Sequence, residues 1–183
     1  IGLSKAIYLD ARGLLENYEI YNNFISGGST GIDMETEAND YIRYHYVATI
    51  QNVTVYNNVF SHEAQEGLRF ARYHGENYVP GYETLFNNIT FINNVFHDNA
   101  NNLWMGEASD DTITNVVFRN NILDDDTLNL RNDAITGVTT DHNAFSSGCT
   151  GTDCQTGVIG FVDKSGNDFH LSSSSQHKDL HGD

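Results

Sequence analysis

The chain is poor in positive charge. Its 183 residues contain 9 lysines and arginines against 25 aspartates and glutamates, which gives a formal net charge of −16 at pH 7. Nucleic acids and anionic membranes are bound by basic surfaces, so this charge argues against both as partners. It fits a protein that works in salt, near cations or on neutral glycans. It fits equally well an acidic surface that serves solubility alone.

Long apolar runs and prolines are also scarce. No apolar stretch approaches the about 20 residues that a membrane-spanning helix needs. Hydrophobic residues nevertheless make up 39% of the chain, which is long enough to bury a core, so we expect one domain. A single proline among many asparagines and glycines is typical of a turn-rich β architecture.

Only two cysteines are present, Cys149 and Cys154, with four residues between them. Two cysteines are too few for a structural zinc site by themselves. A small disulfide loop in an exported protein is the preferred interpretation, and we therefore expect a secreted or periplasmic protein.

What the chain does contain is a nine-residue motif that recurs. Residues 52–60 (NVTVYNNVF) have counterparts at 17–25, 88–96, 115–123 and 137–145. The last asparagines of the copies are spaced by 35, 36, 27 and 22 residues: Asn23, Asn58, Asn94, Asn121 and Asn143. A constant motif at a varying period indicates a solenoid whose coils carry loops of different length. Asparagine at this point suits a tight bend, because it tolerates left-handed backbone angles, and its stacked amides can form a ladder.

A second short strand follows each copy, with alternating side chains. Its apolar members are Ile7 and Leu9, Ile32 and Met34, Leu68 and Phe70, Leu103 and Met105, and Leu128 and Leu130. Alternation points them to one side, where stacked coils bury a face that one coil cannot bury alone. We therefore predict an all-β fold, a right-handed single-stranded parallel β-helix of about five coils with an asparagine ladder.

The predicted β-helix covers residues 1–171, and residues 172–183 form a polar tail. The chain enters directly on a core strand, and an uncovered β-helix end exposes unpaired strand edges. We therefore expect a missing N-terminal segment or a second chain to cap this end.

The outward side of the second strand is the candidate site. Its predicted columns are Tyr8, Asp33, Arg69, Trp104 and Asn129, and beside them Asp10, Glu35, Ala71, Gly106 and Arg131, with Arg12 and Glu37 one step further. Mixtures of flat aromatic rings and converging polar groups bind carbohydrates. The predicted substrate-binding residues are Tyr8, Arg12, Glu37, Arg69, Trp104 and Arg131, with His74 from a long loop.

Three carboxylates on this face are the candidate catalytic groups. Neighbouring strands are about 4.8 Å apart, so Asp10 and Glu35 approach the about 5–5.5 Å separation of a retaining glycosidase pair. Two carboxylates this close cannot both ionise freely, which gives an acid beside a base. We predict Asp10 as the nucleophile, with Glu35 or Asp33 as general acid/base.

β-Elimination on a uronic-acid polymer is the competing chemistry. It needs a base, here Arg69, and a cation or arginine to neutralise the substrate carboxylate. None of the lysines Lys5, Lys164 and Lys178 falls on the core of the site-facing strand, which favours hydrolysis. No cofactor is expected to be required, although the acidic patch could hold Ca²⁺.

Other metals are not expected from the sequence. Apart from His177 and His181 in the polar tail, no histidine pair has the His-x-x-x-His spacing of a metal site, which argues against zinc. The run of aspartates at 124–126 is interpreted as solvated turn caps or weak Ca²⁺ ligands.

These coils resemble the right-handed parallel β-helix of the pectate-lyase-like superfamily. Residues 6–10 (AIYLD) followed by residues 31–35 (GIDME) are similar to the strand pair that carries the catalytic carboxylates of β-helical glycoside hydrolases of the β-xylosidase type. The resemblance implies an extracellular enzyme that hydrolyses a polysaccharide or oligosaccharide. It matches Asp10 to the nucleophile and Asp33 or Glu35 to the acid/base.

Two departures from that superfamily bear on the activity. The paired aspartates and nearby Gly-His-Gly of polygalacturonases are absent, and so is an evident lyase lysine. Besides the hydrolase and the lyase, a non-catalytic glycan-binding or structural β-helix module therefore stays open.

Overall fold

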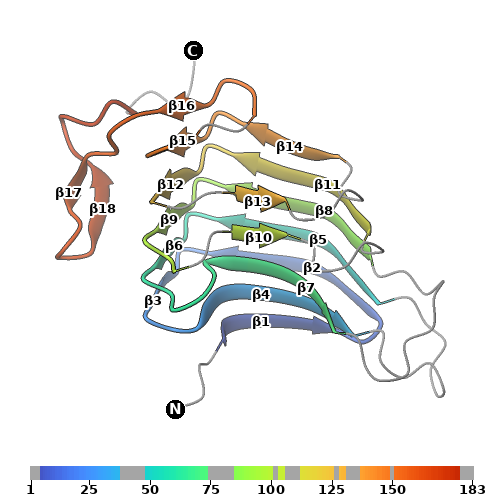
Figure 1. Cartoon of the computed structure of the whole chain (residues 1–183). Helices are drawn as coiled ribbons and strands as arrows, with labels where there is room; N and C mark the ends of the chain where they lie inside the picture. The colour runs from blue at the N-terminus through green and yellow to red at the C-terminus, as the bar shows by residue number, and fades with distance from the viewer. Residues whose placement is uncertain are drawn as a thin grey trace.

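A computed structural model describes residues 5–37, 48–73, 85–100, 103–105, 112–125, 128–130, 137–148 and 151–177. All regular secondary structure within these residues is β, and three parallel sheets form the body of the protein (Figure 1). Over the same residues there is no helix of the length and apolarity that crossing a membrane requires.

The chain visits the three sheets in turn. Sheet A is formed, in spatial order, by β1 (Lys5–Ala11), β4 (Thr30–Glu37), β7 (Leu68–Tyr73), β10 (Leu103–Met105) and β13 (Leu128–Leu130). Sheet B is formed by β2 (Leu14–Tyr21), β5 (Thr49–Tyr56), β8 (Leu85–Ile92), β11 (Thr112–Arg119) and β14 (Val138–Asp141). Sheet C is formed by β3 (Phe24–Ser26), β6 (Val59–Ser61), β9 (Val95–His97), β12 (Ile122–Asp124), β15 (Ala144–Phe145) and β16 (Gln155–Thr156).

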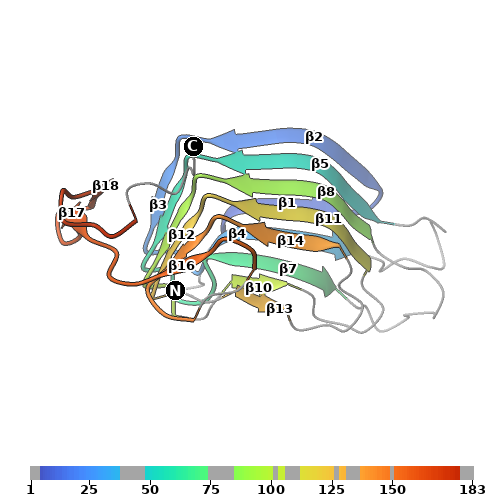
Figure 2. The same ribbon diagram turned by 90° about the horizontal axis from the view of Figure 1, so that it is seen from above.

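Sheets A and B lie on opposite sides of the molecule, and sheet C joins them at one end (Figure 2). Strands of one sheet come from successive passes of the chain, and every pairing within sheets A, B and C is parallel. The arrangement is compatible with a parallel β-helix.

The predicted lateral register of the apolar columns of sheet A is confirmed. The lateral pairs run Ile7–Ile32–Leu68 and Leu9–Met34–Phe70–Met105–Leu130. Phe70 stacks on Phe86 of sheet B at 5.0 Å between ring centroids, and both side chains are fully buried. Each coil thus covers the apolar face of its neighbour.

The asparagine ladder is present and runs through buried side chains. The Nδ2 of Asn58 donates to the Oδ1 of Asn94 at 3.0 Å, and Asn94 donates to Asn121 at 3.0 Å. Asn121 continues the ladder to Asn143 at 3.1 Å, and Asn23 extends it at the other end by donating to Asn58 at 2.9 Å.

We had expected the ladder asparagines themselves to adopt the left-handed backbone conformation, and this expectation is wrong. It belongs to the asparagines one position earlier, with φ of 56° at Asn22, 55° at Asn57 and 56° at Asn93. The bend and the ladder are therefore made by two successive asparagines, because one side chain points into the core while the preceding residue turns the backbone.

After the last coil the chain folds back on sheet C. β17 (Phe161–Asp163) and β18 (Asp168–Leu171) form an antiparallel hairpin, at the side of the stack in Figure 1. Phe161 and Phe169 pack with Ile122 and Ala144 in a second, smaller core on the outer face of sheet C.

The segments on either side of this hairpin bear on two predictions. Cys154 is disulfide-bonded, as predicted, while Cys149 lies outside the described residues. In the predicted polar tail, Ser175 and His177 are buried, so the start of this segment packs on the body of the protein.

Candidate functional site

The lateral pairs predicted for the outward side of sheet A are confirmed within the described residues, which do not include Gly106 and Arg131. They run Tyr8–Asp33–Arg69–Trp104–Asn129 and Asp10–Glu35–Ala71. We call the charged and phenolic side chains that gather at the first three strands the outer-face cluster: Lys5, Tyr8, Asp10, Arg12, Asp33, Glu35 and Arg69.

Asp33 is the anchor of this cluster. Its side chain is fully buried. Arg69 donates two hydrogen bonds to it, from Nε to Oδ1 at 2.9 Å and from Nη2 to Oδ2 at 2.6 Å. The hydrogen bond with Asp33 raises the pKa of Arg69 above its usual value. Because both oxygens of Asp33 are occupied and shielded, this carboxylate holds other groups in place.

Glu35 lies on the same strand, closer to the surface. Its Oε2 accepts hydrogen bonds from the Nζ of Lys5 at 2.7 Å and from the hydroxyl of Tyr8 at 3.1 Å. The Nη2 of Arg69 is 3.5 Å from the same oxygen. Three donors therefore converge on one oxygen of Glu35.

Lys5 corrects the expectation that no lysine reaches the core of the site-facing strand. It is the first residue of β1, and its Nζ lies 2.6 Å from Asp33 and 2.7 Å from Glu35. The ammonium also lies 3.7 Å from the centre of the Tyr8 ring. Partial burial alone lowers the pKa of Lys5, but the hydrogen bonds to Asp33 and Glu35 outweigh it and raise the pKa overall.

Asp10 is the carboxylate of the cluster with the fewest contacts. Its side chain is 24% exposed, and its Oδ2 lies 3.8 Å from the Nε of Arg12, too far for a hydrogen bond. Its Oδ1 is buried and has no hydrogen-bond partner among the described residues. Buried polar atoms without a partner are uncommon in native proteins, so a functional reason is warranted.

The charges of the cluster balance. Three carboxylates, Asp10, Asp33 and Glu35, are matched by three cations, Lys5, Arg12 and Arg69. Neither Lys5 nor Arg69 is left over to neutralise an acidic ligand.

Tyr8 gives a prediction that can be checked without a substrate. Partial burial, and then the charge of Glu35, raise the pKa of Tyr8 to about 12. The unfolded chain loses this proton near the ordinary tyrosine pKa of 10.0, so the stability that Tyr8 contributes declines as the pH rises from there through about 12. We expect the tyrosinate absorbance of the wild type minus that of Tyr8→Phe to rise only near pH 12. Circular dichroism checks that both proteins stay folded, and a difference midpoint near 10 would contradict the raised pKa of this hydroxyl.

The other predicted site residues are less fully placed. Trp104 is half-buried in β10 beside Arg69, and Arg12 is exposed beside Asp10. Glu37 is the last residue of β4. Arg131 and His74 lie outside the described residues.

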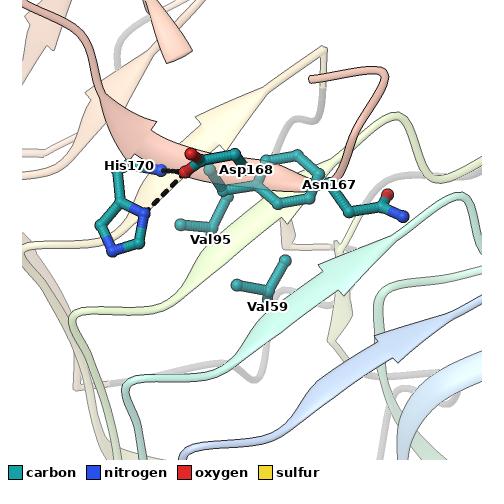
Figure 3. Close-up of a pocket in the computed structure, with 6 residues that line it drawn as sticks. Val59, Val95, Asn167, Asp168 and His170 are labelled. Carbon is teal, nitrogen blue, oxygen red and sulfur yellow. Dashed lines mark hydrogen bonds and ion pairs between the residues drawn. The ribbon is translucent and has the colours of Figure 1, made fainter. Parts of the chain in front are cut away.

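A pocket of about 320 Å³ lies elsewhere, between sheet C and the hairpin. Val59 and Val95 line one side, and residues 167–170 of the hairpin line the other (Figure 3). At its rim Asp168 and His170 form an ion pair at 2.6 Å, and this hydrogen bond lowers the pKa of Asp168. No residue predicted for the site lines this pocket.

A scan against protein-family models and searches of curated proteins and solved structures found no match to the chain. The outer-face cluster is therefore the basis on which a function can be proposed.

Proposed function

We propose that the protein is a secreted or periplasmic glycoside hydrolase that acts on a neutral polysaccharide or oligosaccharide through Asp10 and Glu35. We propose further that its fold is a right-handed single-stranded β-helix of the pectate-lyase-like superfamily. The observation that carries the activity is the lateral pairing of Asp10 with Glu35 on neighbouring strands of an aromatic-lined face.

The pairing fits a retaining mechanism. Neighbouring strands are about 4.8 Å apart, close to the about 5–5.5 Å between the two carboxyl groups of retaining glycosidases. One carboxylate attacks the anomeric carbon, and the other carboxyl group protonates the departing sugar oxygen. Water, deprotonated by that second group, then hydrolyses the glycosyl-enzyme intermediate.

The surroundings of the two groups favour roles opposite to those expected from the resemblance. Donors from Lys5 and Tyr8 hold the Glu35 carboxylate in place, as a nucleophile requires. The Asp10 side chain is 24% exposed, and neither of its oxygens accepts a hydrogen bond from a described donor, so in this proposal its carboxyl group carries the proton for the substrate oxygen. Glu35 is therefore the proposed nucleophile and Asp10 the proposed acid/base.

The other members of the cluster have supporting roles in this proposal. Asp33 and Arg69 position Glu35. Arg69 contacts the carboxylates of both Asp33 and Glu35, and its ion pair with Asp33 holds it in place. Tyr8 and Trp104 offer aromatic surface to a sugar ring, and Arg12 offers a polar contact. Arg131, His74 and Glu37 stay proposed as substrate contacts.

A polysaccharide lyase is the second candidate, because Lys5 supplies the lysine that the sequence analysis did not find on this face. A lyase base must be unprotonated, whereas the hydrogen bonds to Asp33 and Glu35 raise the pKa of Lys5. Lys5 and Arg69 are also paired already, which leaves neither to neutralise a uronate. Hydrolysis of a neutral glycan is therefore favoured, with Ca²⁺ not required.

A panel of neutral and uronic polysaccharides tests the proposal. Reducing ends and the absorbance of unsaturated uronic products are followed together, with Glu35→Gln purified in the same way to detect contaminating enzymes. We expect new reducing ends without new absorbance, from the wild type alone. Both signals rising would indicate the lyase, and glycan binding without either signal would indicate a binding module.

A further inference from the structure

A second group of polar side chains lies at the carboxyl ends of two central strands of sheet C. His97 ends β9 and pairs laterally with Asp124, which ends β12. His97, Asp124 and the following Asp125 each place one nitrogen or oxygen atom within 4.8 Å of the others. We call these three residues the corner cluster.

Within the part of the chain that the structure describes, two buried atoms of the corner cluster make only ion-pair contacts: the Oδ2 of Asp124 faces both the Nδ1 of His97 and the Nζ of Lys164. The Nδ1 of His97 and the Oδ2 of Asp124 are 2.9 Å apart, and the two side chains are only 7% and 5% exposed. Their distance is that of an ion pair, yet neither atom has a hydrogen-bond partner of acceptable geometry among the described residues. Two ligands on a tetrahedral ion with bonds of about 2.1 Å lie about 3.4 Å apart, so this pair has to separate by about 0.5 Å to hold Zn²⁺.

A cation already lies beside these atoms. Lys164, from the turn of the hairpin, forms an ion pair with Asp124, and its Nζ is 3.9 Å from the Oδ2 of Asp125. The lysine side chain is 40% exposed, so it can withdraw into solvent without unfolding anything around it.

We propose that His97, Asp124 and Asp125 form a binding site for a divalent transition metal ion such as Zn²⁺, for which Lys164 competes. An imidazole together with carboxylates suits Zn²⁺, whereas Ca²⁺ takes oxygen ligands alone. Water would complete the coordination. His62 and Asp98 flank the site, since they and His97 form a second group of the same kind.

This site could not be predicted from the spacing of residues along the sequence, because its ligands come from different coils. His97 and Asp124 are 27 residues apart along the chain but lie side by side in sheet C. A search for closely spaced histidines therefore does not find these residues, although the stacking of coils brings them together.

The test is a calorimetric titration of Zn²⁺ into the metal-free full chain and three variants. We expect the wild type to bind one ion per chain. Lys164→Met should bind Zn²⁺ about tenfold more tightly, because a competing positive charge is removed. Asp125→Asn should bind Zn²⁺ at least about tenfold more weakly, because a ligand is lost. Asp125 is exposed, so the Asp125→Asn variant is expected to fold as the wild type does. The control is His142→Ala, which removes a ligand from a third described group, Asp141, His142 and Asp153, and should bind as the wild type does.

Three outcomes would overturn the proposal. One is the absence of Zn²⁺ binding to both the wild type and Lys164→Met. Another is binding that His142→Ala abolishes and Asp125→Asn leaves intact. The third is equal affinity in the wild type and Lys164→Met, because the lysine would then not compete for the site. This site is independent of the proposed hydrolase activity.

Discussion

Glu35→Gln is expected to lower kcat by at least about a thousandfold on every substrate, because a nucleophile is needed whatever the leaving group. Asp10→Asn should behave differently. On a glycan with a poor leaving group it should lose about 10²- to 10⁴-fold, the usual contribution of general acid catalysis. On an aryl glycoside whose leaving group needs no proton, formation of the intermediate should stay close to the wild-type rate.

Comparing the rates of one variant on the two substrates distinguishes a catalytic role from damage to the fold, because damage to the fold lowers both rates equally. Asp10→Asn should melt as the wild type does, whereas Glu35→Gln should stay folded at the assay temperature but melt lower, because Lys5 loses a charged partner. Wild-type turnover by Glu35→Gln would contradict the nucleophile assignment. Equal losses on both substrates in Asp10→Asn would contradict its role as proton donor.

Asn94→Ala is expected to destabilise the protein by about 3–5 kcal/mol. The Oδ1 of Asn94 accepts hydrogen bonds from the backbone and side-chain nitrogens of Asn58, both at 3.0 Å. Its Nδ2 donates to the backbone oxygen of Val55 at 2.9 Å and to Asn121 at 3.0 Å. Alanine leaves these buried groups unpaired, and each costs about 1–3 kcal/mol, not fully additively.

The neighbouring residue provides a matched control. Asn93 turns the backbone with φ of 56°, a conformation that glycine adopts without strain. Asn93→Gly should therefore change the free energy of unfolding by no more than about 1 kcal/mol. Urea denaturation of both variants measures the difference, and equal losses would mean that the ladder contributes no more than the bend.

The register of sheet A could be predicted because two periodicities act together. Alternation with a period of two decides which side chains face the core, and the recurring motif aligns one coil with the next. The pairs Tyr8–Asp33 and Asp10–Glu35 follow from these two rules alone.

The contacts of Lys5 and the burial of Asp33 could not be predicted, because they depend on how far individual side chains reach. Alternation places Lys5 on the same side as Ile7 and Leu9, but at the end of a strand its long side chain reaches round to Asp33 and Glu35. The burial of Asp33 likewise depends on the two hydrogen bonds from Arg69. Neither a periodicity nor a motif encodes such contacts.

Trapping the covalent intermediate tests the proposed reaction most directly. A fluorinated glycoside with a good leaving group would slow release of the intermediate, and mass spectrometry of the digested protein would locate the sugar. We predict an adduct on Glu35. An adduct on Asp10, or turnover with inversion and no adduct at all, would contradict the assignment.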